Sequence, residues 1–471
     1  MRRKESFPEQ LHRYRGVLTV ISVPVLLIIF IIAVMPHGSP TDFLTPESTE
    51  EIKTTGEVVT TAQENNPLPA GKSKDVYAVV FDAGSTGSRV HVVHFEQVKD
   101  TLELQSDSLQ QLKPGLSSYA DDPETAANSL KPLLEFALKH VPKDAQAQTK
   151  VKLGATAGLR LLPDGKADAI LSAVRSYLAK SPFELDPDTG VTILDGSDEG
   201  AFAWLTLNYL LGFLGKDGAE TMAAIDLGGG SVQEAFALTD AQAKAAPDPL
   251  YVTPLKGGGR TYSVYVHSYL GYGLMAGRAA VLAWEEARKA NPCVPTDHTG
   301  TFEYGGQTYD LIPSLEGASR AACERLVTLV LKQNEPCGAE QTQCSFAGAW
   351  GGGHAPKAFY VSSYFWDRAV EAEIIKDHNA LTYTLKPKDL EEAADMACQL
   401  KASDMSTVFP DVDKKQAPFM CLDLSFCHSL ITHGFKIAAD SKITLVKRIQ
   451  YKDEEIEAAW PLGAAINMLN N

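Results

Sequence analysis

The chain has 471 residues, of which 44% are hydrophobic and 22% are charged, and its formal net charge is -16. Its length makes a single domain improbable, and its composition excludes a collagen-like, a wholly disordered and a polytopic membrane protein. The excess of acidic residues argues against a nucleic-acid partner, so an anionic ligand would need a local binding site.

The first expected element is a membrane span. Residues 16–35 form an uncharged apolar run that is long enough to cross a bilayer. Basic residues dominate the segment before the run and acidic residues dominate the segment after it, which keeps residues 1–15 in the cytosol. We expect a single-pass type II anchor with the rest of the chain in a lumen or outside the cell, and a cleaved signal peptide is the alternative.

The next segment, residues 36–74, is rich in Thr, Ser, Pro and Glu. Such a composition cannot bury enough apolar surface to offset the loss of chain entropy. We expect a flexible stalk here, and we expect the folded body to begin at Asp75.

Two similar hairpins are expected in this body. An apolar run from Asp75 to Phe81 is followed by the loop DAGSTGSR and by a second strand-like run, Val90–Phe95. The same order returns around DLGGGSVQ, where Asp226 lies 144 residues after Asp82 (226 minus 82). This repetition predicts two similar subdomains, each presenting one hairpin to a shared cleft.

The loops of these hairpins suit the binding of a polyphosphate. Glycines let backbone N–H groups approach an anion closely, and Ser or Thr hydroxyls add further donors. Asp82 and Asp226 at the strand ends could hold a hydrated Mg²⁺ or Ca²⁺ ion. A pair of ordinary turns is the alternative. A Walker A loop, with Gly-Lys-Ser/Thr, is absent from the sequence.

Two patches between the hairpins carry further candidates. Gly154–Arg160 (GATAGLR) follows a short strand, Val151–Leu153, and its Thr156 could contact a metal-bound water. Glu199 in DGSDEG precedes a helical run, and a phosphohydrolase needs a base for its attacking water. An ordinary strand-to-helix turn is the alternative for the first patch, and a helix-capping acid is the alternative for the second.

The later part of the chain contains every cysteine. Nearest-neighbour pairing is one possible disulfide pattern, although the spacing alone does not fix it, and it leaves Cys427 unpaired. Disulfides indicate an oxidising compartment, whereas free thiols in a cytosolic enzyme are the alternative. The expected pairs are Cys293 with Cys323, Cys337 with Cys344, and Cys398 with Cys421.

The motifs DAGSTGSR, GATAGLR, DGSDEGAFAW and DLGGGSVQ, with Trp460–Ala465 near the end, resemble the conserved regions of the apyrase or nucleoside triphosphate diphosphohydrolase family. The resemblance covers nearly everything after Asp75 and is strongest to plant-type membrane-anchored apyrases. It implies an α/β fold of two actin-like, ribonuclease H-like lobes with the active site in the cleft between them. We assign residues 75–197 and 453–471 to lobe I and residues 198–452 to lobe II.

The resemblance also implies roles for individual residues. Glu199 matches the catalytic base, Asp82 and Asp226 match the acids that hold Ca²⁺ or Mg²⁺ through water, and Thr156 matches a further partner of that water. The family stacks the nucleobase on aromatic residues of the second lobe, for which Tyr364, Phe365 and Trp366 are candidates, although FYVSSYF also fits a buried strand. The residues matching the phosphate loops are Ser85, Thr86, Gly87, Ser88, Arg89, Gly228, Gly229, Gly230, Ser231 and Gln233.

The expected function is hydrolysis of nucleoside tri- and diphosphates to monophosphates by a Golgi membrane enzyme with a luminal catalytic body, the plasma membrane being the alternative location. A diphosphate-preferring GDPase or UDPase is the alternative activity. An exopolyphosphatase and a catalytically silent nucleotide receptor remain as further hypotheses. Two minor features are expected to be structural, namely Trp204 as a core residue and Lys256–Arg260 as a surface turn.

Overall fold

The computed structural model describes residues 73–84, 87–99, 101–160, 162, 165–338, 343–353, 356 and 358–470. All of them belong to one compact unit of the chain, residues 57–471. The predicted tail, the predicted anchor and all but the last two residues of the predicted stalk lie outside the described residues. None of the helices formed by the described residues is both long enough and apolar enough to span a bilayer.

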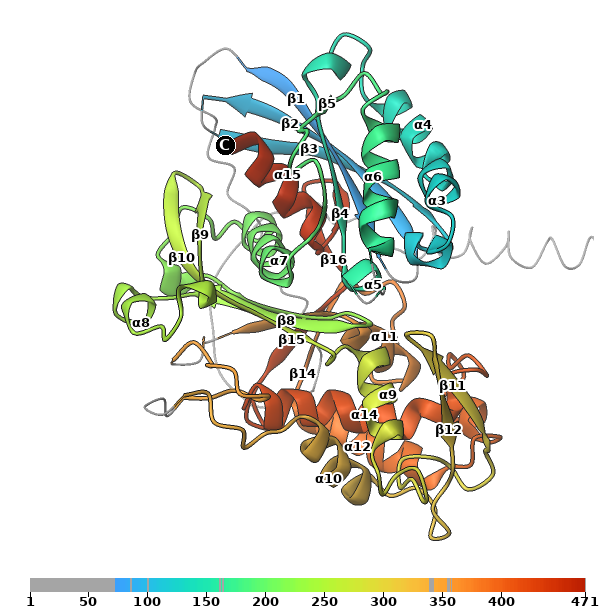
Figure 1. Cartoon of the computed structure of the whole chain (residues 1–471). Coiled ribbons are helices and arrows are strands. Elements are labelled where there is room, and N and C mark those ends of the chain that lie inside the picture. Colours follow the sequence, from blue (N-terminus) through green and yellow to red (C-terminus); the bar gives the residue numbers. More distant parts are fainter. Residues whose placement is uncertain are drawn as a thin grey trace, which may run out of the picture. The chain divides into compact units, whose positions relative to one another are not determined.

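The first sheet has six strands (Figure 1). β1, β2 and β3 are antiparallel neighbours, whereas β4 runs parallel to β1, β5 and β6. The β1 side chains are buried on both faces of the sheet, which explains the continuous apolar run in the sequence. The strands are β1 (Lys74–Ala83), β2 (Ser88–Val98), β3 (Thr101–Leu112), β4 (Lys150–Ala155), β5 (Glu184–Leu185) and β6 (Val191–Ile193).

The second sheet has seven strands in the order β14-β15-β13-β7-β8-β10-β9. Its central part repeats the first sheet, because β7, β8 and β10 are antiparallel neighbours and β13 runs parallel to β7. The two predicted hairpins are therefore confirmed as equivalent parts of two similar sheets. The strands are β7 (Ala223–Leu227), β8 (Ser231–Ala237), β9 (Val252–Gly257), β10 (Arg260–Leu270), β13 (Phe359–Ser363), β14 (Thr382–Leu385) and β15 (Ile443–Val446).

Three apolar cores hold the sheets and helices together. One face of the first sheet is covered by α3 (Pro123–Ser129), α4 (Lys131–His140) and α6 (Lys166–Leu178). Its other face shares a core with the second sheet, with α7 (Gly196–Leu210) and with α15 (Trp460–Asn470). Figure 1 shows α7 and α15 between the two sheets. Trp204 of α7 is fully buried in this shared core, as expected.

The far face of the second sheet carries the largest core. It is covered by α9 (Leu274–Ala283), α10 (Arg320–Val330), α11 (Tyr364–Glu371), α12 (Pro387–Gln399) and α14 (Met420–Ser429). The remaining short elements are η1 (Leu116–Tyr119), η2 (Gln146–Gln148), α5 (Ala157–Arg160), η3 (Gly218–Glu220), α8 (Asp240–Lys244), η4 (Pro249–Tyr251), β11 (Gly300–Tyr304), β12 (Gln307–Leu311), α13 (Met405–Val408), η5 (Ala417–Phe419), η6 (Leu430–Gly434), β16 (Arg448–Tyr451) and β17 (Glu454–Glu457).

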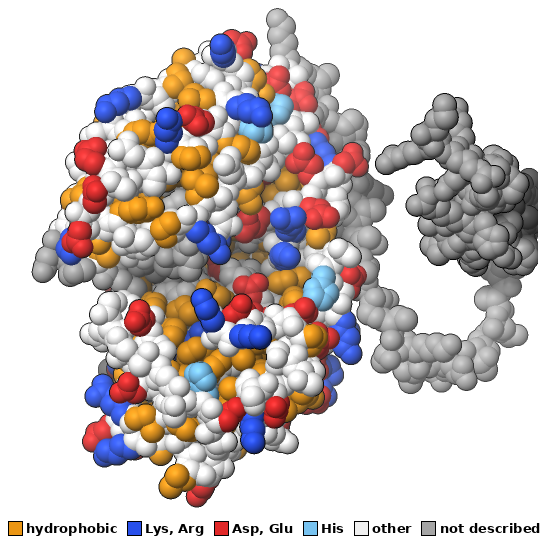
Figure 2. Space-filling view, turned by 90° about the vertical axis from the view of Figure 1, so that its right-hand side faces the viewer, with side chains coloured by type: hydrophobic (Ala, Val, Ile, Leu, Met, Phe, Trp, Pro, Cys, Tyr) orange, Lys and Arg blue, Asp and Glu red, His pale blue; other side chains and the backbone are white. Residues whose placement is uncertain are grey.

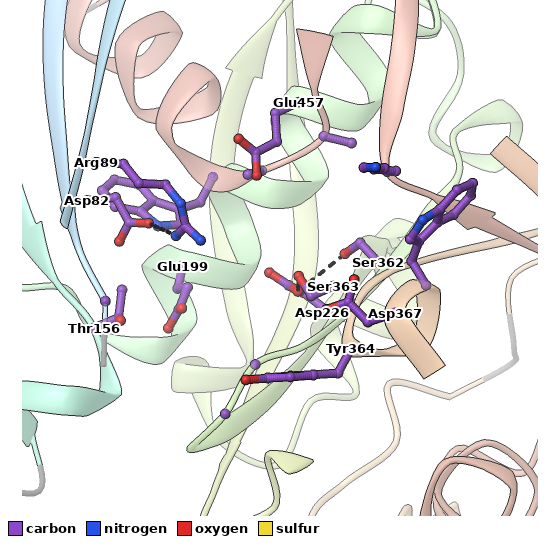
Figure 3. Close-up of a pocket in the computed structure, with 18 of the residues that line it drawn as sticks. Asp82, Arg89, Thr156, Glu199, Asp226, Ser362, Ser363, Tyr364, Asp367 and Glu457 are labelled. Carbon is purple, nitrogen blue, oxygen red and sulfur yellow. Dashed lines mark hydrogen bonds and ion pairs between the residues drawn. The ribbon is translucent and has the colours of Figure 1, made fainter. Parts of the chain in front are cut away.

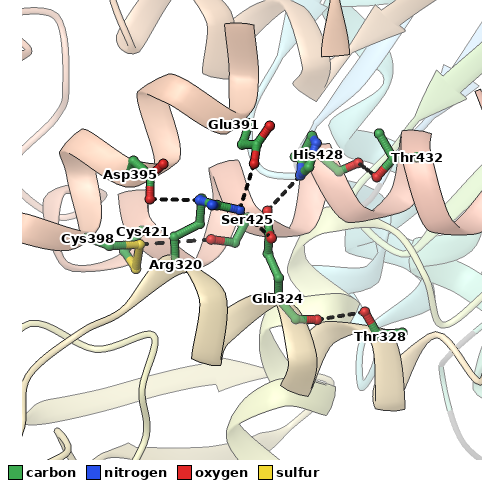
Figure 4. Close-up of polar contacts among 10 residues, drawn as sticks. All are labelled: Arg320, Glu324, Thr328, Glu391, Asp395, Cys398, Cys421, Ser425, His428 and Thr432. Atoms are coloured by element: carbon green, nitrogen blue, oxygen red, sulfur yellow. Dashed lines mark hydrogen bonds and ion pairs between the residues drawn. A yellow bond between two sulfur atoms is a disulfide. The ribbon is translucent and has the colours of Figure 1, made fainter. Parts of the chain in front are cut away.

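Charged side chains cross-link the helices of this far layer (Figure 4). Arg320 of α10 pairs with Glu324 of the same helix at 2.6 Å, and with Glu391 and Asp395 of α12 at 3.1 and 2.7 Å. Glu324 in turn lies 2.6 Å from Nδ1 of His428 on α14. The three helices are thus joined by one polar network.

The three expected disulfides are present. Cys427 is the one free cysteine and is fully buried in the core, so it is not accessible for a disulfide to a second chain. The disulfides join Cys293 to Cys323, Cys337 to Cys344 and Cys398 to Cys421.

The structure confirms one predicted boundary, the surface turn, and does not test another, the division into lobes. Lys256–Arg260 is the turn between β9 and β10, as expected. The expected lobe boundaries fall within the first turn of α7 and in the turn between β16 and β17, so the division into lobes at residues 198 and 453 stays a prediction.

On the face drawn in Figure 2, acidic and basic side chains are interspersed.

Candidate active site

A cavity of about 510 Å³ lies beside the equivalent ends of the two sheets (Figure 3). Asp82 lies near the end of β1, and Thr156 directly follows β4, which is parallel to β1. Asp226 of β7 is likewise next to Ser362 of the parallel strand β13. Because parallel strands end at the same edge of a sheet, these side chains converge. The predicted site residues that line the cavity are Asp82, Arg89, Thr156, Glu199, Asp226, Gly228, Gly229, Tyr364 and Trp366.

Asp82 is buried, and only one of its carboxylate oxygens has a partner. Arg89 Nη1 lies 3.0 Å from Asp82 Oδ2, whereas Oδ1 is buried and has no hydrogen bond among the described residues. Burial raises the pKa of Asp82, although Arg89 opposes the shift. Arg89 therefore forms an ion pair with Asp82 in this structure, whereas the sequence analysis predicted that Arg89 binds phosphate.

Asp226 is held in a similar way by hydroxyl groups. Ser363 Oγ and Ser362 Oγ donate to Asp226 Oδ1 at 2.5 and 3.3 Å. Both bonds are made to Oδ1. The other carboxylate oxygen, Oδ2, makes no hydrogen bond to a described residue. Burial raises the pKa of Asp226, and the two serines oppose that rise.

Glu199 enters the cavity from the first turn of α7. Asp195, not Glu199, caps this helix by accepting a hydrogen bond from the Ser197 N–H at 2.8 Å, so capping does not explain Glu199. A Cβ on Gly196 would lie 2.3 Å from the Cβ of Ser268, which shows that only glycine lets this turn pack so closely on β10.

The Glu199 carboxylate is bound on one oxygen and free on the other. Arg160 Nη2 donates to Oε2 at 2.7 Å, and Gln233 Nε2 lies 3.3 Å from the same oxygen. Burial raises the pKa of Glu199 to about 8, with Arg160 lowering it and the two aspartates raising it further. Its Oε1 has no hydrogen bond among the described residues, which leaves this oxygen for water.

The second glycine-rich loop is fixed by α9. The carbonyl of Gly228 accepts from Leu274 N–H at 2.9 Å, and that of Gly229 accepts from Met275 N–H at 2.9 Å. Ser231 and Gln233 are buried below the loop, and Gln233 Nε2 lies 2.8 Å from Ser231 Oγ. These two residues therefore support the loop and Glu199 without lining the cavity.

The first glycine-rich loop is only partly described. Ser85 and Thr86 lie outside the described residues. Gly87 and Ser88 are buried and do not line the cavity, and neither does Gly230 of the second loop. Their predicted contacts with phosphate stay predictions.

The wall on the side of the second sheet contains two of the three predicted aromatic residues. The strand interpretation of FYVSSYF holds only to Ser363, because α11 begins at Tyr364. Tyr364 and Trp366 line the cavity together with Asp367. Phe365 points into the core and is fully buried, so its assignment to base binding is wrong.

A buried ion network holds α11 in place. Arg368 Nη1 lies 2.7 Å from Oδ2 of Asp423 on α14, and Arg278 Nε of α9 lies 2.7 Å from Asp423 Oδ1. All three side chains are almost completely buried. Removing one partner of a buried ion pair strongly destabilises a protein, because the other charge is left buried without a partner. The network fixes the helix that presents Tyr364 and Asp367 to the cavity.

The cavity suits a hydrated divalent cation. Asp82, Glu199 and Asp226 each keep one carboxylate oxygen without a hydrogen bond to the described residues, and all three pKa values are raised, chiefly by burial. Oxygen ligands are those that Ca²⁺ and Mg²⁺ prefer, and Mg²⁺ usually keeps several of its waters. Among the described residues, no three acidic, His or Cys side chains are placed to hold an ion directly.

Sequence reasoning missed several residues that line the cavity or support it. Arg160 lies in a motif that was singled out, but its role depends on a contact with Glu199 across 39 positions. No local pattern marks the others. The polar cavity-lining residues without a prior assignment are Gln111, Lys113, Ser362, Ser363, Asp367, Lys447 and Glu457.

Ser363 combines a functional contact with backbone strain. Its φ of 62° and ψ of -124° are unfavourable for a residue with a side chain. We expect Ser363→Ala to lower kcat/KM by roughly 3–10-fold, because the 2.5 Å bond that orients Asp226 is lost. Steady-state kinetics over a range of divalent-cation concentrations would measure this loss.

Two further variants separate the hydroxyl group from the strain at Ser363. Ser363→Gly also removes the hydroxyl but permits the positive φ, so it should melt at a higher temperature than Ser363→Ala while showing the same kinetic loss. Ser362→Ala, which removes only a 3.3 Å contact to Asp226, should have a smaller effect. Equal activity of Ser363→Ala and the wild type would show that the serine does not support Asp226.

Known proteins resemble this chain over most of its length. Residues 70–471 match the model of the GDA1/CD39 (nucleoside phosphatase) family. The chain is 42% identical to "Probable apyrase 2" of Oryza sativa subsp. japonica, over 99% of this chain and 97% of that protein. It is also 42% identical to "Nucleoside-triphosphatase" of Pisum sativum, over 84% of this chain and 88% of that protein.

A solved structure supports the fold. The crystal structure of nucleoside triphosphate hydrolases from Neospora caninum superposes with a TM-score of 0.61, covering 84% of this chain and 93% of that chain, at 15% sequence identity. At this identity the likeness concerns the arrangement of the two sheets and their helices. The expected actin-like α/β architecture is thereby confirmed for the described part of the chain.

Proposed function

The chain belongs to the GDA1/CD39 (nucleoside phosphatase) family, and from this membership and the cavity we propose that it is an apyrase, which hydrolyses nucleoside tri- and diphosphates to monophosphates and phosphate. The observation that carries the proposal is the convergence of Glu199, Asp82 and Asp226 on one cavity in a chain 42% identical to plant apyrases over nearly its whole length. Relatives named for apyrase and nucleoside-triphosphatase activity favour this function over a diphosphate-preferring GDPase or UDPase.

In the proposed reaction, Glu199 deprotonates and orients the attacking water. Arg160 and Gln233 hold Oε2, so the free Oε1 accepts the proton of a water that attacks the terminal phosphorus in line with the leaving oxygen. The bond from phosphorus to the leaving oxygen breaks as the bond to water forms. The carboxyl group keeps the proton until solvent removes it, and no phosphoenzyme is formed.

Other residues of the cavity bind the substrate. The two glycine-rich loops hold the phosphates by backbone N–H groups and hydroxyls, and Arg89 and Lys113 supply positive charge to the same tail. Tyr364 stacks on the nucleobase, and Trp366, which is mostly buried in the core, borders the same wall. Asp82 and Asp226, with Thr156, would hold a hydrated Ca²⁺ or Mg²⁺ ion, and that ion would offset the charge that builds up on the phosphoryl oxygens.

The location of the enzyme is part of the proposal. Residues 16–35 serve as a type II anchor in the Golgi membrane and place the catalytic body in the lumen. The three disulfides support an oxidising compartment. Fluorescence microscopy and protease protection of a chain tagged at its C-terminus test this location, and a protease-accessible tag in intact cells would favour the plasma membrane instead.

A substrate panel tests the activity. The full-length chain in detergent is incubated with ATP, ADP, GDP, UDP or polyphosphate, with and without a divalent cation. We expect phosphate release from both tri- and diphosphates, a monophosphate end product and no activity in a chelator. Rapid cleavage of GDP and UDP with little cleavage of ATP would contradict the apyrase assignment, and cleavage of polyphosphate alone would indicate an exopolyphosphatase.

A further inference from the structure

We propose that Glu457 is a further acidic residue of the divalent-cation site, acting on the waters of the ion from the side of β17. The inference rests on the proposed function, in which Asp82 and Asp226 hold a hydrated cation. Glu457 is the last residue of β17 and lines the same cavity as both aspartates. Figure 3 shows it on the opposite side of the cavity from Tyr364, with its carboxylate directed inward.

The hydrogen bonding of Glu457 sets it apart from the other acids. Asp82, Asp226 and Glu199 each have one oxygen engaged by Arg, Ser or Gln side chains. Glu457 has no hydrogen bond and no ion pair to any residue that the structure describes, although it is partly buried. Glu457 is attracted to Arg89 only through space, so both of its carboxylate oxygens stay available to a ligand.

The charge balance of the inner cavity supports the same assignment. Five carboxylates line the cavity, and arginines lie within ion-pair distance of only two of them, Asp82 and Glu199. Lys113 and Lys447 also line it, but the acids still outnumber the basic side chains, and a divalent cation would reduce this excess of negative charge.

The elements that carry Glu457 fix its position. β16 and β17 form a two-stranded sheet in which Ile449 pairs with Ile456, and both side chains are buried in the core between the two large sheets. Three residues after Glu457, Trp460 begins α15 and also lines the cavity. A carboxylate held between the buried Ile456 and the buried start of α15 suits ligand binding better than one on a free loop.

Calorimetric titration of the full-length chain in detergent tests the proposal. Ca²⁺, and separately Mg²⁺, is added to the wild type and to variants in the presence of the β,γ-imido analogue of ATP, so that binding is measured without turnover. We expect Glu457→Gln to weaken ion binding by about 10–100-fold, and Glu457→Asp to retain part of the affinity. Glu455→Gln removes a charge from the same strand, where Glu455 pairs with the exposed Arg448, and should bind the ion as the wild type does.

Melting temperatures in EDTA distinguish ion binding from a structural role. Without an ion, Glu457→Gln should melt at or above the wild-type temperature, because the repulsion between carboxylates is relieved. A fall of that temperature, or wild-type ion affinity in Glu457→Gln, would overturn the assignment of Glu457 alone. A wild type that binds no divalent cation and hydrolyses nucleotides in EDTA would overturn the proposed metal dependence together with it.

Discussion

Glu199→Gln is expected to lower kcat by about 10²–10⁴-fold, the usual contribution of a general base. The amide keeps the shape of the side chain and can still contact Arg160 or Gln233, but it cannot accept a proton from water. Nucleotide binding should therefore persist. Single-turnover kinetics measure the chemical step, and calorimetry with a nucleotide and Ca²⁺ measures the binding. Substantial turnover by Glu199→Gln would refute the assigned role.

The pH dependence of the wild type gives an independent check on Glu199. Burial raises its pKa to about 8, and repulsion from Asp226 and Asp82 adds to the shift, so in the absence of a cation this base is mostly protonated at pH 7. A nearby cation favours the ionised carboxylate and lowers the pKa. The acidic limb of the kcat/KM profile should therefore move to lower pH as the Ca²⁺ or Mg²⁺ concentration rises. A limb that does not move would argue against ion binding beside Glu199.

Asp226→Asn should reduce activity by about 10²–10³-fold at a fixed cation concentration, comparable with the loss of a group that stabilises charge in a transition state. The variant keeps the size of the side chain but removes a negative charge from the cavity. The activity curve should also shift to higher cation concentrations, because the amide oxygen attracts the waters of the ion less strongly. Titrating the rate with Ca²⁺ and with Mg²⁺ separates the two effects.

Asp367→Asn provides a matched control for Asp226→Asn. Asp367 lines the same cavity from α11, and among its electrostatic neighbours are Arg368 and Lys447, so its charge is already partly offset. Its substitution should leave the cation titration curve unchanged. An Asp226→Asn curve that coincides with the wild-type curve would show that Asp226 does not hold the ion.

Local sequence patterns were sufficient for the hairpins, whereas the cysteine spacing allowed the disulfide pairs without fixing them. The strand limits around Asp82 and Asp226 follow from short β-branched runs interrupted by glycine, because these patterns report backbone geometry and burial over a few residues. The repetition of that pattern also predicted two similar sheets. The disulfide pairs are those of neighbouring cysteines in the sequence, with separations of 30, 7 and 23 residues.

Local patterns were less reliable for the three aromatic residues that were candidates for base binding. Tyr364, Phe365 and Trp366 are consecutive, and the sequence offered no means of separating them. Because α11 begins at Tyr364, successive side chains turn by about 100° around the helix axis. Phe365 therefore enters the core, whereas Tyr364 faces the cavity.

The sequence by itself determined the strands on either side of the glycine-rich loops, where those loops lie, and that Glu199, Asp82 and Asp226 are candidate site residues. The tertiary structure alone decided which side chains meet, since Arg160 reaches Glu199 across 39 positions and Ser363 reaches Asp226 across 137. Glu457 joins them only because the last hairpin packs between the two sheets. The physical reason is that a residue's local pattern reports its own backbone and burial, whereas a functional contact depends on how separate elements pack against one another.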